Sequence, residues 1–447
     1  MDSGFKSGFQ SRGGTNRGYP NRMPNMRTLY PPLPPPLGPR LQSIKSKSIQ
    51  TDMCDLMDAK ITQRQYVASY NLMAYPSMEI LVPGCPPLWT PPREASQLEP
   101  DKGSYYRDEN AARFPEHPFH PAIKSMFHQE PCFDTTSVDV FACASTLGNL
   151  LRFVSGEHRP FSMVVETVGR SAFFLRREES PAALIDGIQG YGHAFPEAYT
   201  TWEHDVKGSM SSQRIIRYKF GGLDFLLRFE ADGYIGSHRP ACPVTRDASA
   251  VDDLIKALKV DTAIPMMRVS QAGKVVSQED LFDLKTRTSK RKNDDIIGQE
   301  LPRLWARQVS QLVLAFHTSG KFDEIRIENI RERMLEWETN RATELRKCAV
   351  LVKDIVAAVK ETSDGMMEVR CTEAGILELR AVPANKVKAL PDELKQLWIN
   401  RPPKSSDHDI GKDEKTGYHD SDDDDEVALD YTACTAEDCG YCGHCSY

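Results

Sequence analysis

Residues 281–287 read Leu-Phe-Asp-Leu-Lys-Thr-Arg, an apolar run that carries an acid and a lysine at alternate positions. Alternate side chains of a β-strand share a face, so Asp283 and Lys285 point the same way. About fifty residues earlier, Glu230 and Asp232 alternate in the same manner. Together these strands offer three carboxylates and one ammonium, a set that can bind a divalent cation and hold a water beside a phosphodiester. Either strand alone is more typical of a surface strand with a salt bridge.

The composition indicates a chain with a real hydrophobic core. It has 447 residues, of which 40% are hydrophobic, and its mean hydropathy is -0.48. No apolar run is long enough to cross a bilayer and no secretory signal follows Met1, so we expect a nuclear or cytoplasmic protein that is neither secreted nor membrane-bound. Seven of the eleven cysteines are scattered singly, which favours reduced, mostly buried thiols.

The two ends differ sharply in charge. Residues 1–50 hold eight Lys or Arg and one acid, whereas residues 404–447 hold three Lys and thirteen acids. We expect residues 1–50 to be a disordered tail rich in Arg, Gly and Pro, and residues 404–430 to be a disordered acidic linker. The Arg-Gly pairs can touch RNA, and the Pro-rich and acidic segments can bind a protein partner.

Between these tails the pattern predicts one domain. Residues 51–104 are expected to be an extension packed on a core of residues 105–403. Hairpins are predicted at 161–176, 214–230 and 367–380, strands at 311–316 and 324–330, a helix at 301–308 and one long amphipathic helix at 331–360. Hairpins with flanking helices indicate an α/β fold with a mixed β-sheet.

Four segments follow one another in the order and approximate spacing of one family: residues 190–197, 229–232, 282–286 and 304–308. On these motifs the chain resembles the DXO and Rai-type decapping and 5′-end-processing nucleases, over about residues 145–395. The resemblance implies a PD-(D/E)xK-like nuclease core, and hydrolysis of phosphodiester or cap pyrophosphate bonds at RNA 5′ ends. RNA would be the substrate, with Mg²⁺ or Mn²⁺ as cofactor.

Carried over by position, the resemblance implies roles for individual residues. Lys285 would orient the attacking water, and Gln308 would position water or phosphate. Leu147 stands where relatives carry an arginine that meets the RNA 5′ end. A non-catalytic RNA-binding or scaffold protein on the same fold therefore remains open. The implied metal ligands are Glu197, Glu230, Asp232, Asp283 and the carbonyl of Leu284.

Basic residues follow the acid–lysine strand closely. We predict a nucleic-acid-binding group of Arg287, Lys290, Arg291, Lys292 and Arg307, because neutralising phosphates supplies most of such affinity. The alternative interpretation of Arg287 and residues 290–292 is a solvated charge run or an import signal.

The C-terminal residues 431–447 contain four closely spaced cysteines. Four thiolates at this spacing can bind Zn²⁺ tetrahedrally, so a small zinc knuckle is predicted, with free thiols or an iron–sulfur cluster as alternatives. The predicted ligands are Cys434, Cys439, Cys442 and Cys445.

Aspartate pairs also raise a polyprenyl (geranylgeranyl) diphosphate synthase as a remote alternative. Such an enzyme is all helical and needs two Asp-Asp-x-x-Asp motifs. Here Asp294-Asp295 is followed by Ile296-Ile297-Gly298, which lacks the closing acid, and the predicted hairpins contradict an all-helical chain. This alternative is rejected.

Overall fold

The computed structural model describes residues 33–51, 59–102, 104–106, 108–178, 180–182, 184–185, 190–236, 267–383 and 388–400. All of them belong to one compact unit, residues 1–404. The predictions for residues 1–32, for the acidic linker and for the cysteine knuckle lie outside these ranges.

Strands dominate the unit, in two large mixed sheets. The larger has the order β1-β19-β18-β7-β8-β6-β12-β11-β2-β3-β14, the smaller has the order β10-β4-β13-β15-β16-β17, and β5 pairs with β9. The strands are β1 Arg40–Lys45, β2 Thr62–Met73, β3 Glu79–Gly84, β4 Leu88–Trp89, β5 Tyr105–Tyr106, β6 Val140–Cys143, β7 Phe161–Val168, β8 Ser171–Arg176, β9 Leu184–Ile185, β10 Thr200–Thr201, β11 Ser209–Phe220, β12 Leu223–Glu230, β13 Gly233–Tyr234, β14 Arg268–Gly273, β15 Leu281–Thr288, β16 Gln311–Thr318, β17 Lys321–Asn329, β18 Met366–Glu373 and β19 Ile376–Ala381.

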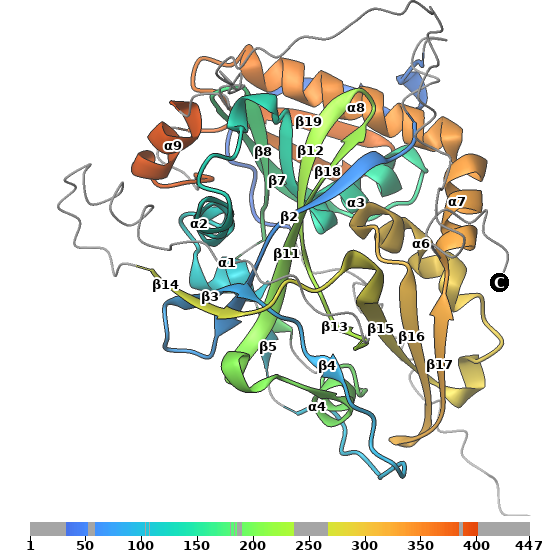
Figure 1. Ribbon diagram of the computed structural model, residues 1–447. Coiled ribbons are helices and arrows are strands. Elements are labelled where there is room, and N and C mark those ends of the chain that lie inside the picture. The colour runs from blue at the N-terminus through green and yellow to red at the C-terminus, as the bar shows by residue number, and fades with distance from the viewer. Residues whose placement is uncertain are drawn as a thin grey trace, which may run out of the picture. The chain divides into compact units, whose positions relative to one another are not determined.

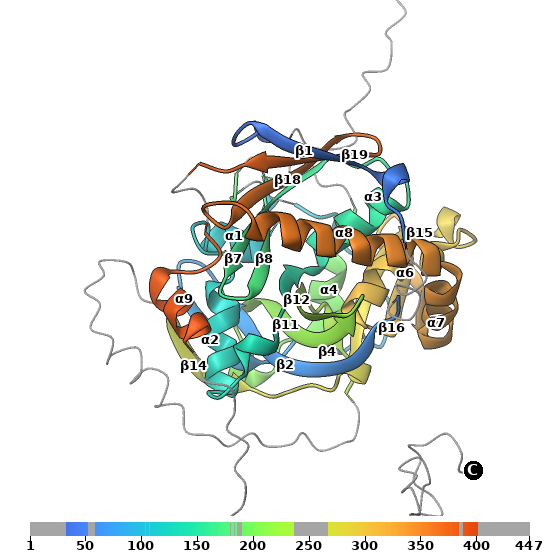
Figure 2. The same cartoon turned by 90° about the horizontal axis from the view of Figure 1, so that it is seen from above.

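Helices cover both faces of the larger sheet (Figures 1 and 2). One face packs against α3 and α8, and the other against α2 and α9. The mixed α/β architecture is confirmed, and two broad sheets exclude the all-helical synthase fold. The helices are α1 Glu109–Arg113, α2 His120–Gln129, α3 Ala144–Val154, α4 Ala194–Tyr199, α6 Ile296–Arg307, α7 Arg331–Asn340, α8 Ala342–Lys360 and α9 Asp392–Ile399.

The hairpin of β7 and β8 shows why this sheet is buried on both faces. Its apolar residues are nearly continuous, so both alternating sets find a core. Val165 and Phe174 join the cluster with α3 and α8, whereas Phe173 packs edge-on against Trp398 of α9, with ring centroids 5.2 Å apart. Gly169 takes a positive φ of 61° in the predicted turn.

One expectation for the N-terminal region is wrong, and a second is refined. Residues 33–50, predicted to be disordered, include β1, which pairs antiparallel with β19 at the edge of the larger sheet. The predicted extension is part of the sheet itself, because β2 pairs with β11 and β3. Main-chain hydrogen bonds therefore incorporate these segments, which side-chain composition did not reveal.

The single long helix predicted over 331–360 is also wrong, since α7 and α8 meet at a break. Arg341 has φ of -104° and ψ of 17°, outside the helical region. Glu338 of α7 accepts a hydrogen bond from the indole N–H of Trp305 at 2.8 Å, which holds α7 against α6. Helix α8 packs instead on α3 and β7 (Figure 1). Two different neighbours thus require two helices.

The chain passes from the larger sheet to the smaller between Glu230 and Gly233. β12 ends in the larger sheet at Glu230, and β13 pairs antiparallel with β15 from Gly233 onward. β15 then pairs parallel with β16, and α6 connects these two strands. The predicted acids of both strands therefore lie at the junction of the sheets.

The described cysteines fit the expectation of reduced thiols. Cys85, Cys143, Cys348 and Cys371 are free and buried, and Cys132 is free and exposed. Among the helices described, none is long and apolar enough to cross a membrane.

The turn between β11 and β12 gives a test of the fold. A Cβ at Gly221 would lie 2.4 Å from the Cβ of Ala349 in α8, and φ there is +61°. Gly156 has a φ of +79° but no atom within 4 Å of such a Cβ. We expect Gly221→Ala to lower the free energy of unfolding by about 2–4 kcal/mol and Gly156→Ala by about 1–2 kcal/mol, measured by urea denaturation. Equal losses would contradict close packing of this turn on α8.

Candidate active site

A cavity of about 640 Å³ lies at the junction of the two sheets. Residues from β12, β15, α4 and α6 line it, so four separate segments meet there. Six of the sequence-predicted site residues are among its lining: Glu197, Glu230, Asp232, Leu284, Lys285 and Arg287.

β15 forms one wall of this cavity through its alternation. Phe282 and Leu284 point into an apolar cluster with Phe195 and Phe322. Asp283 and Lys285 lie on the other face, which α6 covers: Arg303 contacts Asp283, and Glu300 lies 3.8 Å from Lys285. The two polar side chains do point the same way, toward α6.

Asp283 is held by two arginines. Its side chain is only 2% exposed, one oxygen accepts a short hydrogen bond from Arg303, and the other accepts from Arg307 at 2.9 Å. Burial alone would raise the pKa of Asp283, but the two guanidinium groups outweigh it and hold the pKa below its usual range. Asp283 is therefore a charged, fully paired carboxylate.

Glu300 extends this ion-pair network along α6. Its carboxylate accepts from Arg303 Nε at 3.0 Å and from Arg287 at 3.4 Å, and Lys285 Nζ lies 3.8 Å away. Arg303 is thus shared between Asp283 and Glu300. Lys285 keeps only a long contact, so its ammonium remains available to a group in the cavity.

Asp232 and Glu230 provide the acids on the opposite wall. Asp232 accepts a hydrogen bond from the Leu284 backbone N–H at 2.8 Å, which joins the end of β12 to β15. Burial, followed by the charge of Asp283, raises the pKa of Asp232 to about 6. Glu230 is exposed at the cavity surface. Loss of solvent around its carboxyl group, followed by the negative charges of Asp232 and Asp108, raises its pKa to about 8. The negative charge of each neighbouring carboxylate thus makes ionisation of the next acid less favourable.

The start of α4 brings Glu197 to the same cavity. Asp101 accepts from the backbone N–H of His193 at 3.1 Å and of Ala194 at 2.8 Å, which fixes the first turn of this short helix. The His193 ring stacks on Tyr105, with centroids 3.5 Å apart, and both residues line the cavity. These rings form a flat aromatic surface beside Glu197.

The donor set fits a hard divalent cation in kind, because Glu197, Glu230 and Asp232 offer carboxylate oxygens to one cavity. It is not drawn together as a ligand cluster: within the described ranges, no three Asp, Glu, His or Cys side chains stand close enough to hold a metal ion. Asp283 is occupied by its arginines. Glu197, Glu230 and Asp232 are therefore the residues that would hold Mg²⁺ or Mn²⁺, and Asp283 could join only by giving up an arginine.

Gln308 is not brought to the cavity. It ends α6 in the left-handed conformation, with φ of 53°, and its side-chain amide donates to the Trp305 carbonyl at 2.7 Å. Its neighbour Arg307, predicted to bind nucleic acid, is the residue that reaches Asp283. The left-handed turn at the helix end directs the Gln308 side chain back to α6. Arg307, one residue earlier, lies beside Asp283 instead.

The other predicted basic residues lie apart from the cavity lining, except Arg287. Ser289–Arg291 form a short 3-10 helix after β15. Arg291 pairs with Asp294 at 2.7 Å, and Lys292 lies 4.0 Å from Glu324. Nucleic-acid binding by residues 290–292 stays a prediction.

A second cavity, of about 230 Å³, was missed from the sequence and borders the first at Arg303. Six arginines and one acid, Glu178, line it: Arg152, Arg159, Arg176, Arg177, Arg303 and Arg307. Gly148 also lines it, so Arg152 lies near Leu147, the position at which the sequence resemblance led us to expect an arginine. Helical spacing, four residues from Gly148 to Arg152, is the signal that could have found it.

The N-terminal segment borders this arginine-lined cavity. Leu33 is part of its lining. Arg177 donates to the Pro35 carbonyl at 2.7 Å, Arg370 donates to the Pro34 carbonyl at 2.6 Å, and the Leu37 N–H donates to Glu368 at 2.8 Å. The proline segment is therefore fixed by its backbone beside β18.

Comparisons with known proteins agree with this fold. A family model described as "Domain of unknown function (DUF8563)" matches residues 42–398. No curated protein matches the chain. S. pombe Rai1 is similar with a TM-score of 0.50 and 11% identity, over 76% of this chain and 99% of Rai1. Scheffersomyces stipitis Rai1, solved with (3'-NADP)+ and a calcium ion, is similar with a TM-score of 0.52 and 12% identity, over 81% of this chain and 99% of its own. At such identities the likeness is one of fold.

Removing the Asp283 carboxylate should destabilise the protein, whether or not it is an enzyme. Asp283→Ala leaves Arg303 and Arg307 without their shared partner, so we expect a loss of about 3 kcal/mol in the free energy of unfolding. Lys285→Ala on the same face, with its partner at 3.8 Å, should cost less than about 1 kcal/mol. Denaturant unfolding of both variants measures this, and equal stabilities would show that the arginine pairs do not fix β15 to α6.

Proposed function

Because the chain belongs to the DUF8563 family, whose description assigns no function, we propose its role from its fold and its site: a divalent-metal-dependent nuclease acting at RNA 5′ ends. It would hydrolyse phosphodiester or cap pyrophosphate bonds. The observation that carries the proposal is that Glu197, Glu230, Asp232 and Lys285, from three segments of the chain, line one cavity.

The proposed chemistry follows from the charges in the cavity. Bound Mg²⁺ or Mn²⁺ would supply Lewis-acid activation of a water and of the phosphate. Asp232, held by the Leu284 N–H, and Glu230 would bind the ion. Lys285 would face the phosphate and balance the negative charge that develops on it. Arg303, between the two cavities, would fix a neighbouring phosphate oxygen.

Similar folds give further support for a nucleotide substrate. The S. stipitis Rai1 structure contains a dinucleotide with a calcium ion, and S. pombe Rai1 has been solved with 3'-FADP. Both ligands contain phosphates, and a calcium ion prefers the oxygen donors that this cavity offers. The resemblance of the four sequence motifs points to RNA 5′ ends.

The arginine-lined cavity would bind RNA phosphates next to the reaction centre. Arginine forks bind phosphate oxygens in pairs, and six of them line this cavity. Arg177, Arg303 and Arg307 also pair with carboxylates outside the lining, those of Glu368, Asp283 and Glu300. An RNA 5′ end that spans both cavities would place one phosphate by Lys285 and the next among the arginines. In this arrangement Arg152 would take over from the missing arginine at position 147.

A non-catalytic RNA-binding protein is the second candidate. The pairing of Asp283 with two arginines favours it, because a carboxylate so neutralised is a poor metal ligand. The arginine-lined cavity would then bind RNA without cleavage. The two candidates differ in whether the protein cleaves RNA when a divalent metal ion is added.

Cleavage is tested with 5′-labelled RNAs bearing a cap, a triphosphate or a monophosphate. We expect cleavage with Mn²⁺ or Mg²⁺ that a chelator abolishes, and a loss of at least about 100-fold in Asp232→Ala and in Lys285→Ala. Arg333→Gln, which removes an exposed partner of Asp295, serves as the control. The nuclease proposal is contradicted if folded wild-type protein cleaves none of these RNAs. It is also contradicted if both site variants cleave them as fast as the wild type.

RNA binding is tested in the Asp232→Ala background, where cleavage cannot interfere. Replacing Arg159 with Gln should weaken binding of single-stranded RNA. If one phosphate contact is lost, the slope of log K against log salt should fall by about 0.7. Arg333→Gln should leave the slope unchanged. An equal slope in both variants would place RNA outside the arginine-lined cavity.

A further inference from the structure

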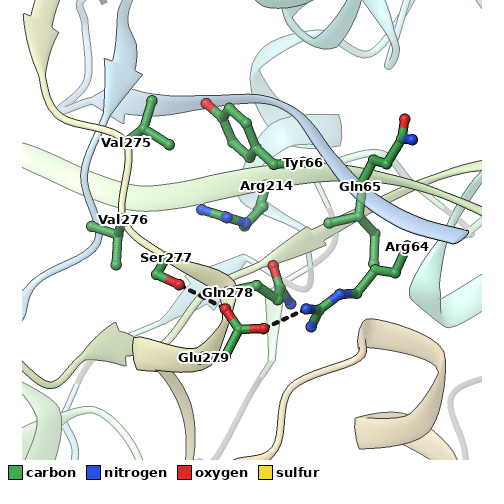
Figure 3. Close-up of a pocket in the computed structure, with 10 residues that line it drawn as sticks. Arg64, Gln65, Tyr66, Arg214, Val275, Val276, Ser277, Gln278 and Glu279 are labelled. Carbon is green, nitrogen blue, oxygen red and sulfur yellow. Dashed lines mark hydrogen bonds and ion pairs between the residues drawn. The ribbon is translucent and has the colours of Figure 1, made fainter. Parts of the chain in front are cut away.

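A third pocket, of about 250 Å³, lies between β2, β11 and residues 275–279 (Figure 3). It shares no lining residue with the two cavities at the candidate active site. Its walls carry two arginines, Arg64 and Arg214, and one acid, Glu279. None of these residues has a role in the function proposed above.

Arg214 is the unusual group in this pocket. It is only 2% exposed, and its guanidinium lies over the Tyr66 ring, 4.5 Å from the centroid. Its buried Nε has no hydrogen-bond partner, and among the described residues no carboxylate oxygen lies within ion-pair distance of it. Figure 3 shows Arg214 in the middle of the pocket. A buried cation without a paired anion is costly to a folded protein.

The only acid that lines the pocket is already committed. Glu279 forms a short ion pair with Arg64 and accepts from the Ser277 hydroxyl at 2.6 Å. Burial lowers the pKa of Arg214 to about 10, which still leaves it charged at neutral pH. The three ionised side chains thus carry one net positive charge, located on Arg214.

Gln278 presents a second unsatisfied group. Its side-chain NH₂ donates to the carbonyls of Arg307 and Gln308, at 3.0 and 3.1 Å, which fixes the direction of the amide. Its buried Oε1 accepts nothing. The pocket therefore contains a positively charged donor, the Arg214 guanidinium, and one acceptor, Gln278 Oε1. This combination suits an anion that also carries a hydroxyl group.

We propose that this pocket binds a phosphate group through Arg214, with Gln278 accepting a hydrogen bond from a hydroxyl on the phosphate or its ribose. A guanidinium fork matches phosphate oxygens, and a single negative charge balances the pocket. Its volume is below the roughly 300–1,000 Å³ of pockets for whole drug-sized ligands, so it takes one group. The phosphate belongs to a free nucleotide or to an RNA chain. The inference does not rest on nuclease activity.

The pocket lies directly behind the end of α6. Arg64 donates to the Gln308 carbonyl at 3.5 Å, and Gln278 holds the carbonyls of residues 307 and 308. The side chain of Arg307 reaches Asp283 on the other side. A phosphate at Arg214 would thus share one pocket with Arg64 and Gln278, which hold the end of α6.

The test measures binding of inorganic phosphate, a ribonucleoside monophosphate and a short single-stranded RNA to the full chain by calorimetry. Thermal unfolding in phosphate is compared with unfolding in chloride of equal ionic strength. Arg214→Met should remove one phosphate site or weaken it at least about tenfold, as loss of a charged hydrogen bond predicts. The same variant should unfold in chloride at or above the wild-type temperature, because an unpaired charge is gone. Arg333→Gln should match the wild type.

An unchanged number of phosphate sites, each with its wild-type affinity, in Arg214→Met overturns the proposal. So does a large drop in its unfolding temperature in chloride combined with no effect of phosphate on the wild type, since Arg214 is then purely structural. If Arg214→Met does not fold, Arg214→Lys keeps the charge without the fork: at least about tenfold weaker binding supports the site, and unchanged binding refutes it. Loss of mononucleotide binding identifies a nucleotide site, and loss confined to the oligonucleotide identifies an RNA contact.

Discussion

The ion pairs between Asp283 of β15 and two arginines of α6 hold the candidate active site together. A buried carboxylate needs partners to remain charged, and Arg303 and Arg307 supply both of them. The pairs fix α6 across the polar face of β15, while Phe282 and Leu284 secure the other face in an apolar cluster. One strand therefore belongs to a hydrophobic core on one side and to a charged network on the other.

The same pairs separate the two cavities. Arg303 lines both, so the wall between the acidic cavity and the arginine-lined cavity is itself a charged side chain. In the proposed function, a phosphate among the arginines would compete with Asp283 for Arg303 and Arg307, whereas a cation among the acids would compete with the arginines for Asp283. Binding of the two ligands would then be coupled through one shared set of charges, in a direction that favours both together.

The sequence was informative where the signal is local. Alternation in β15 predicted that Asp283 and Lys285 share a face, and turn residues such as Gly169 predicted the hairpins. It failed where partners are distant. The pairing of β1 with β19 joins residues more than three hundred positions apart, and no local pattern encodes it. Likewise, the break at Arg341 follows from the different neighbours of α7 and α8. Arg307 lies beside Asp283 in place of Gln308 because the backbone turns at the end of α6. The arginines of the second cavity come from three separate segments, so only the fold brings them together.

The proline segment beside β18 has a consequence for any shortened form of the protein. Arg177 and Arg370 give hydrogen bonds to the carbonyls of Pro35 and Pro34, and Leu33 forms part of the arginine-lined cavity. Proteolytic removal of residues up to 39 would spare every strand and helix that the structure describes. It would also free two arginines from backbone acceptors and widen the mouth of that cavity. If the proposed function holds, a trimmed protein and the intact one would share a fold and a candidate site but differ in the bulk of the RNA end that each admits.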